Sequence, residues 1–164
     1  MSPTGFLPGF AADEIYSSLR VFARASRLGY AMADGKGFLV DLPNRKSFSP
    51  DAAFIRGAHS GMKFFDRAPT FAVEVRSEHD YGKTSEREIA AKIADYLVAG
   101  TLAVWDVDLL AIEVVRLYTA TNPIVPQVFT RGDLAHAAEA VPNWSMPVEE
   151  LFPYHVPFSE HDLE

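Results

Sequence analysis

The order in which helix-type and strand-type segments follow one another limits the fold of this 164-residue chain more than any other feature. Apolar residues at helical spacing predict amphipathic helices at Asp13 to Leu28, with Asp13 as N-cap, and at Thr84 to Ala99. The other ordered segments are short and rich in β-branched and aromatic residues, which is typical of strands. The order α-β-β-β-β-α-β-β-β therefore predicts an α+β fold with one central sheet.

The strands are expected between clear turn signals. Tyr30 to Asp41 predicts a hairpin, because Asp34-Gly35 is a strong turn pair, whereas Asn44 to Pro50 is polar and predicts a loop. Further strands are expected at Asp51 to Ile55, Thr70 to Arg76, 101–108, 109–118 and 127–130, and a short helix or turn at Met146 to Phe152.

Length and composition favour one globular domain. A chain of 164 residues with 48% hydrophobic residues can bury one core and leaves little room for a second, so we expect a single domain over 1–152 and an acidic tail over 153–164. No apolar run approaches the ~18 residues of a membrane span, and residues 1–14 do not resemble a signal peptide. The absence of cysteine fits a reducing compartment. These features predict a cytoplasmic protein without a membrane partner.

The charge is unevenly distributed along the chain. The net charge of −7 argues against nucleic-acid binding by the whole surface. However, residues 1–92 carry 13 basic and 11 acidic residues, whereas residues 93–164 carry 2 and 11. Any polyanion must therefore meet the first half of the chain, and residues 41–92 alone hold 9 of the 15 basic residues. A polarised surface and a solvated acidic tail both remain open explanations.

Two charged residues interrupt the otherwise apolar strand expected at Thr70 to Arg76. Glu74 and Arg76 share one face of this strand, because side chains alternate with a period of two. Charged side chains are rarely buried unless they are paired or bind a metal. Glu74 therefore lies either on a solvated edge strand, with a salt bridge to Arg76, or in a metal site.

Asp51 provides a second carboxylate for the metal hypothesis. Asp51 and Glu74 lie on consecutive strands, so their side chains could converge on one hard cation such as Mg²⁺. A backbone carbonyl next to Glu74, for example that of Val75, could complete the site. A bound metal would polarise a phosphoryl oxygen and lower the pKa of a coordinated water.

The basic residues near these acids admit two interpretations. Lys92 lies in the helix after Glu74, and packing of that helix on the sheet could bring its ammonium group to the carboxylates. Alternatively, Lys92 forms a surface ion pair with Glu88 at i,i+4 spacing. Arg76 cannot act as a base because its pKa is too high, so a phosphate-binding role suits it better.

Other catalytic patterns are missing from the sequence. The five histidines show no metal-ligand spacing, and no phosphate-binding glycine loop or serine nucleophile motif occurs.

Four segments in a fixed order resemble a known family. SPDAAFI, PTFAVEVRS, AAKIADYLVAGTLAVWDVD and PNWSMPVEELF together resemble the Uma-two family of candidate restriction endonucleases, a branch of the PD-(D/E)XK nuclease superfamily. The resemblance extends from about the first helix to Phe152. The residues that carry it are Pro50-Asp51, Val73 to Ser77, Lys92, Tyr96 to Gly100, Val104 to Asp108 and Met146 to Phe152.

The resemblance implies a restriction-endonuclease-like mixed sheet flanked by helices, with Asp51 and Glu74 at a fork in the sheet. It implies hydrolysis of DNA phosphodiester bonds with Mg²⁺, for which Mn²⁺ could substitute. The parent superfamily has a lysine two residues after the second acid, where this chain has Arg76. The resemblance implies that Lys92 replaces that lysine, with Lys83 as a less suitable substitute. Glu14 could be an additional acidic ligand.

The leading hypothesis is a Mg²⁺-dependent endonuclease that acts on DNA and could form a dimer. Its catalytic residues would be Asp51, Glu74 and Lys92, its metal ligands Asp51, Glu74 and Val75, and its substrate-binding residues Arg76 and Lys83. The alternative is a catalytically inactive nuclease-fold binding or assembly module, motivated by the net charge and by Arg76. A third hypothesis is a metal-dependent hydrolase of a small phosphorylated substrate.

Overall fold

The computed structural model describes residues 3–157. The helices are α1 (Phe6–Ser26) and α2 (Lys83–Val98), and two 3₁₀ turns follow late in the chain, η1 (Ala138–Ala140) and η2 (Val148–Leu151). The strands are β1 (Gly29–Ala33), β2 (Phe38–Leu42), β3 (Arg45–Phe48), β4 (Ala52–Arg56), β5 (Phe71–Val75), β6 (Ala103–Val107), β7 (Val115–Thr119), β8 (Gln127–Phe129), β9 (Leu134–His136) and β10 (Ser145–Pro147).

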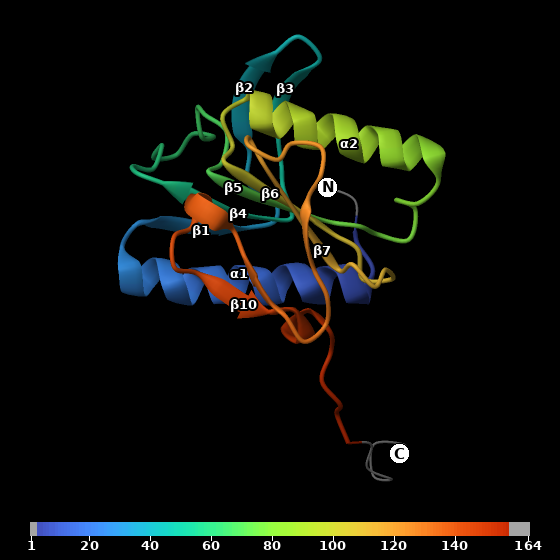
Figure 1. Ribbon diagram of the computed structural model, residues 1–164. Helices are drawn as coiled ribbons and strands as arrows, with labels where there is room; N and C mark the ends of the chain where they lie inside the picture. The colour runs from blue at the N-terminus through green and yellow to red at the C-terminus, as the bar shows by residue number, and fades with distance from the viewer. Residues whose placement is uncertain (1–2, 158–164) are drawn as a thin grey trace.

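Six strands form one mixed sheet in the order β1-β4-β5-β6-β7-β8. Every neighbouring pair is antiparallel except β5 with β6, which is parallel and is connected by α2. The two helices lie on opposite faces of this sheet (Figure 1). Two small antiparallel pairs, β2-β3 and β9-β10, pack around it. The expected α+β fold with one central sheet is therefore confirmed.

The period of two along each strand divides the core into two layers. Side chains that point to the α1 face form the larger cluster, which includes Ile15, Leu19, Phe71, Val73 and Trp105. The intervening side chains point to the α2 face and form the second cluster, which includes Phe38, Ala72, Ile93, Tyr96 and Val104. Because β5 is buried on both sides and is the third strand of six, the edge-strand explanation of Glu74 is wrong.

Helix α1 begins at Phe6, seven residues before the expected start at Asp13. Gly5 is the N-cap, and the first turn contains Pro8, which a helix tolerates there because early N–H groups have no intrahelical partner. Ala11 and Ala12 extend the buried stripe toward the N-terminus. The structure thus places part of the N-terminal segment against the sheet.

The hairpin expected at Tyr30 to Asp41 is wrong. Strand β1 pairs with β4 at the edge of the large sheet, whereas β2 pairs with β3 across a turn at Pro43-Asn44. The loop expected at Asn44 to Pro50 is wrong for the same reason, because it contains β3. The small β2-β3 sheet packs against α2, where the rings of Phe48 and Tyr96 stack with centroids 3.9 Å apart.

The strand expected at 109–118 is shorter than predicted. Asp108 accepts a hydrogen bond from the Leu110 N–H through its side chain and from the Ala111 N–H through its carbonyl, so the chain turns before β7 begins. The sequence did not predict β9 and β10, which have three residues each. The turn expected at Met146 to Phe152 contains η2. Residues 158–164 of the expected acidic tail lie outside the described residues.

Neither described helix combines the length and the hydropathy that a membrane span requires.

Alanine substitutions at two glycines test how closely the edge strand β1 packs against β4. A Cβ on Gly29 would lie 2.2 Å from the carbonyl oxygen of Ile55, on the paired strand β4, whereas a Cβ on Gly9 would lie 3.4 Å from the Thr4 side chain. We expect Gly29→Ala to lower the free energy of unfolding by about 1–3 kcal/mol. Gly9→Ala should raise it by roughly 0.5 kcal/mol, because alanine favours a helix interior. Urea denaturation measures both values. If Gly29→Ala were as stable as the wild type, Gly29 would not be required by the close packing against β4.

Candidate functional site

The sheet forks at the carboxyl end of β5. Strand β4 pairs with β5 only at Phe71 to Val73, whereas β5 continues along β6 to Val75. Asp51, directly before β4, fills the gap, and its Oδ2 accepts a 2.7 Å hydrogen bond from the Val75 N–H. In a strand the N–H and C=O of one residue point to the same side. The Val75 carbonyl is therefore directed toward the side of the fork where Asp51 lies.

Glu74 points to the α2 face, where two side chains hold its carboxylate. Lys92 Nζ lies 2.8 Å from Glu74 Oε1, and the Tyr96 hydroxyl donates a 2.6 Å hydrogen bond to the same oxygen. Burial and the nearby Glu74 charge raise the pKa of Tyr96 well above its usual value, so its hydroxyl remains a donor at neutral pH. Both contacts involve Oε1, so among the described residues Oε2 has no hydrogen-bond partner.

Lys92 contacts Glu74 across the space between α2 and the sheet. Among the described residues Lys92 forms its ion pair with Glu74 and none with Glu88. The surface-pair interpretation of Lys92 is therefore wrong, and the structure brings Asp51, Glu74 and Lys92 to one site.

The negative charges of Asp51 and Glu74 are only partly compensated by neighbouring groups. Burial and the Glu74 charge raise the pKa of Asp51 from 3.8 to about 7, although the Val75 N–H and, to a lesser extent, the Lys92 charge lower it. The Glu74 charge thus disfavours ionisation of Asp51. An added cation between them would remove this penalty.

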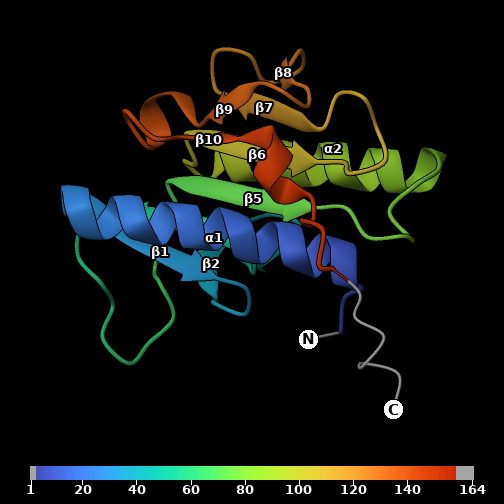
Figure 2. The same ribbon diagram turned by 90° about the horizontal axis from the view of Figure 1, so that it is seen from below.

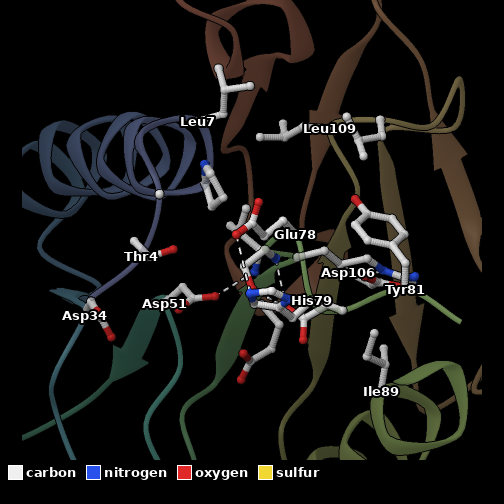
Figure 3. Close-up of a pocket in the computed structure, with 18 of the residues that line it drawn as sticks. Thr4, Leu7, Asp34, Asp51, Glu78, His79, Tyr81, Ile89, Asp106 and Leu109 are labelled. Carbon is white, nitrogen blue, oxygen red and sulfur yellow. Dashed lines mark hydrogen bonds and ion pairs between the residues drawn. The ribbon is translucent and has the colours of Figure 1, made fainter. Parts of the chain in front are cut away.

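These residues line a cavity of about 890 Å³. The first turn of α1, the segment 76–81 and one side of α2 form its other walls. Figure 3 shows Thr4 and Asp34 near Asp51 on one side of the cavity and Tyr81 and Asp106 on the other. Besides Asp51 and Glu74, the acidic residues that line the cavity are Asp34, Glu78, Asp80, Glu88 and Asp106. Asp34 was not predicted as a site residue, because the Asp-Gly pair was explained fully by a turn.

Arg76 is held in a buried ion-pair cluster behind the fork. Its guanidinium donates to both oxygens of Asp106, at 2.9 and 2.8 Å, and to both oxygens of Glu86. These hydrogen bonds raise the pKa of Arg76 further. The side chain is only 4% exposed. The salt bridge considered with Glu74 does not form, and little of the guanidinium remains for a phosphate.

Arg76 is one of the residues that line the cavity, whereas two other predicted residues are not. Lys83 is exposed at the start of α2, and Glu14 is half-buried in α1, and neither lines the cavity. The structure therefore does not bring Lys83 to the place expected of a substrate-binding residue, nor Glu14 to that of a metal ligand.

Comparison with known proteins identifies the family. A family model described as "Uma2: Putative restriction endonuclease" matches residues 1–149. The chain belongs to the Uma2 (Uma-two) family. A crystal structure described as a putative nuclease of the DUF820 group from Anabaena variabilis is similar in fold, with a TM-score of 0.72 at 18% identity over 93% of this chain and 83% of that one. None of the curated proteins matches the chain significantly.

The donor set of this Uma2 protein suits Mg²⁺. Among residues 3–157, no three His, Cys, Asp or Glu side chains form a ready-made metal cluster. Mg²⁺ typically binds one or two carboxylates and completes its shell with water and substrate phosphate oxygens. Asp51 and Glu74, with the Val75 carbonyl, match that pattern. The raised pKa of Asp51 fits it too, since the one positive charge of Lys92 does not offset both burial and the Glu74 charge.

The pH dependence of stability tests the electrostatics of Asp51. Its pKa is higher in the folded than in the unfolded chain, so the folded protein binds the proton more tightly. The protonated Asp51 therefore stabilises the fold, fully below about pH 4. This contribution to the free energy of unfolding, roughly 2–4 kcal/mol, is lost as the pH rises through 7. In EDTA, we expect Asp51→Asn to abolish this loss in thermal melts between pH 4 and 8. If the melting temperatures of the wild type and of Asp51→Asn fell equally between pH 4 and 8, Asp51 would not be the cause of the loss.

A second pair of variants separates the structural role of Arg76 from substrate binding. Within residues 3–157, Arg76→Met leaves the buried Asp106 with Arg116, 3.6 Å away, as its one basic partner. We expect a loss of about 3 kcal/mol in the free energy of unfolding, because breaking a buried ion pair leaves an uncompensated charge. Arg131→Met, which removes an exposed pair with Glu149, is the control and should change stability little. If Arg76→Met were fully stable but failed to bind DNA, the phosphate-binding prediction would hold instead.

Proposed function

We propose that this Uma2 protein hydrolyses phosphodiester bonds of DNA with a divalent cation, most suitably Mg²⁺. The convergence of Asp51, Glu74 and Lys92 at the fork is the observation that supports it. Two carboxylates and an ammonium group on the wall of one cavity are the groups that a metal-dependent phosphodiesterase requires. Family membership supports the same reaction class.

Each residue has a role that follows from its contacts. Asp51 and Glu74 would hold the cation together with the Val75 carbonyl, and the Tyr96 hydroxyl orients Glu74. When bound, the cation polarises the phosphoryl oxygen and lowers the pKa of a coordinated water. Lys92, held 2.8 Å from Glu74, presents its positive charge to the phosphate and stabilises the negative charge that develops during the reaction.

The acidic lining of the cavity makes substrate binding depend on the cation. Asp34, Glu78, Asp80 and Glu88 add to the charge of the two proposed ligands. A phosphodiester would be repelled from this lining unless positive charge were present at the fork. Mn²⁺, which also accepts carboxylate, carbonyl and water ligands, should substitute for Mg²⁺.

A second candidate function is a nuclease-fold binding or assembly module without catalysis. It is favoured by the position of Arg76, which occupies the usual lysine position and is used in a buried cluster. The ion pair between Lys92 and Glu74 also satisfies part of the site without a metal. The cavity volume of about 890 Å³ would further suit a small phosphorylated substrate, as in the third hypothesis.

Plasmid nicking tests the proposed reaction. We expect supercoiled DNA to be nicked with Mg²⁺ or Mn²⁺ and not with EDTA. Glu74→Gln and Lys92→Met should each lower the rate by at least about 100-fold, because one removes a ligand charge and the other the nearby positive charge. Glu150→Gln, an exposed carboxylate outside the cavity, should retain the wild-type rate.

The outcomes distinguish the candidates. Nicking that survives Glu74→Gln would exclude this site as its source. A wild type that binds Mn²⁺ at the fork but nicks no DNA would favour hydrolysis of a smaller substrate. A wild type that neither binds Mn²⁺ nor nicks DNA would favour the non-catalytic module.

A further inference from the structure

A second cavity, of about 580 Å³, lies between the C-terminal half of α1 and the edge strand β1. Figure 2 shows α1 and β1 running side by side, with the N-terminal end of α1 away from this region. Gly29 and Gly57 form part of its wall, and neither contributes a side chain to fill it. The residues that give this groove its chemistry are Tyr16, Arg20, Arg24, Arg27 and Tyr30.

Three arginines of the groove form one stripe with a tyrosine. Tyr16, Arg20 and Arg24 follow one another at intervals of four residues, which places them on one face of α1, and Arg27 is the C-cap residue of that helix. The three arginines are exposed, and among the described residues none lies within salt-bridge distance of a carboxylate. Their charge is therefore available to an external anion.

Residues outside α1 complete the groove. Tyr30, on the edge strand β1, is 43% exposed and lies against His59, with ring centroids 5.9 Å apart. Arg67 lies next to Gly57, and its Nη2 donates to the carbonyl oxygens of Arg56 and Ala58. The Arg67 guanidinium, which also pairs with Asp66 at 3.6 Å, lies behind the Gly57 wall of the groove, and the exposed ring of Tyr30 lines the groove itself.

Helix stability alone does not explain this arrangement. Basic residues near a helix C-terminus interact favourably with the helix dipole, and this accounts for Arg24 and Arg27. It does not account for Arg20, which lies more than one turn before the end, or for the hollow beside the stripe. The net charge of the chain is −7, so this concentration of positive charge is unlike the protein as a whole.

We infer that this groove binds the phosphate backbone of a nucleic acid, at a site separate from the fork. Guanidinium groups bind phosphates through paired N–H donors, and the exposed ring of Tyr30 provides a stacking surface for a base. Along α1, Arg24 lies about 27 Å from Phe6 at the first cavity, at 1.5 Å per residue. The groove holds the polyanion by charge, and the acidic cavity at the fork requires a cation. The inference applies to an active nuclease and to a non-catalytic module alike.

Fluorescence anisotropy with a labelled 30-base-pair DNA duplex in EDTA tests this inference without catalysis. The variant is Arg20→Gln with Arg24→Gln, since glutamine keeps the helix propensity and both side chains are exposed. Arg27 is left unchanged because its φ of 59° lies in the left-handed region. We expect affinity to fall at least about 10-fold, and the slope of log K against log salt to decrease by roughly 2.

The matched control is Lys46→Gln with Arg87→Gln, which removes the same charge on the α2 side of the sheet. It should bind DNA within about twofold of the wild type. Equal weakening by both double variants would overturn the inference, because binding would then follow net charge alone. Absence of salt-dependent binding by the wild type would also overturn it, as would equal competition by poly-glutamate, which would indicate an acidic protein partner.

The result is distinguishable from failure of the proposed hydrolysis. Glu74→Gln should retain the EDTA binding of the wild type, whereas Arg20→Gln with Arg24→Gln should retain the turnover number and raise the KM for DNA. If the wild type bound DNA but did not nick it, the groove would be supported as a DNA-binding site and the proposed hydrolysis would be wrong.

Discussion

Two parallel strands, β5 and β6, lie side by side in a sheet whose other neighbouring pairs all run antiparallel. Parallel strands cannot be joined by a hairpin, so the chain crosses over a face of the sheet, and α2 forms that crossover. This places Lys92 and Tyr96 above the carboxyl end of β5, where Glu74 emerges. The same pairing aligns Glu74 with Asp106 and so places Arg76 beside an acidic partner. The fork and the ion-pair cluster behind it both follow from this topology.

At the fork a side chain takes the place of a strand. Beyond Val73 the backbone of β4 no longer pairs with β5, and the Asp51 carboxylate accepts the Val75 N–H instead. A carboxylate held by a backbone amide has a defined position, and a buried one next to Glu74 has an unfavourable charge. The fork therefore combines precise placement with incomplete charge compensation, which is the combination expected of a cation-binding site.

The sequence predicted the fold class because it depends on local patterns. The period of two placed Glu74 and Arg76 on one face, and the order of strands and helix indicated that Asp51 and Lys92 could lie near Glu74, as they do in the structure. The sequence did not predict the partner of Arg76. Asp106 lies thirty residues away, and local sequence does not reveal which residues of two strands are paired. The hairpin at Asp34-Gly35 failed similarly, since a turn pair indicates that the chain reverses but not which strand it joins. Asp34 was therefore missed at the cavity.

Helix α1 belongs both to the buried core and to the wall of the cavity at the fork. Farther along, this helix contributes Ile15 and Leu19 to the fully buried core. Its first turn lines the cavity at the fork, yet it has no side-chain cap and no acidic residue to offset the helix dipole. Such an end frays at a small free-energy cost, far below that of global unfolding. A local opening of this turn would widen the cavity at the fork while leaving the sheet and its core intact.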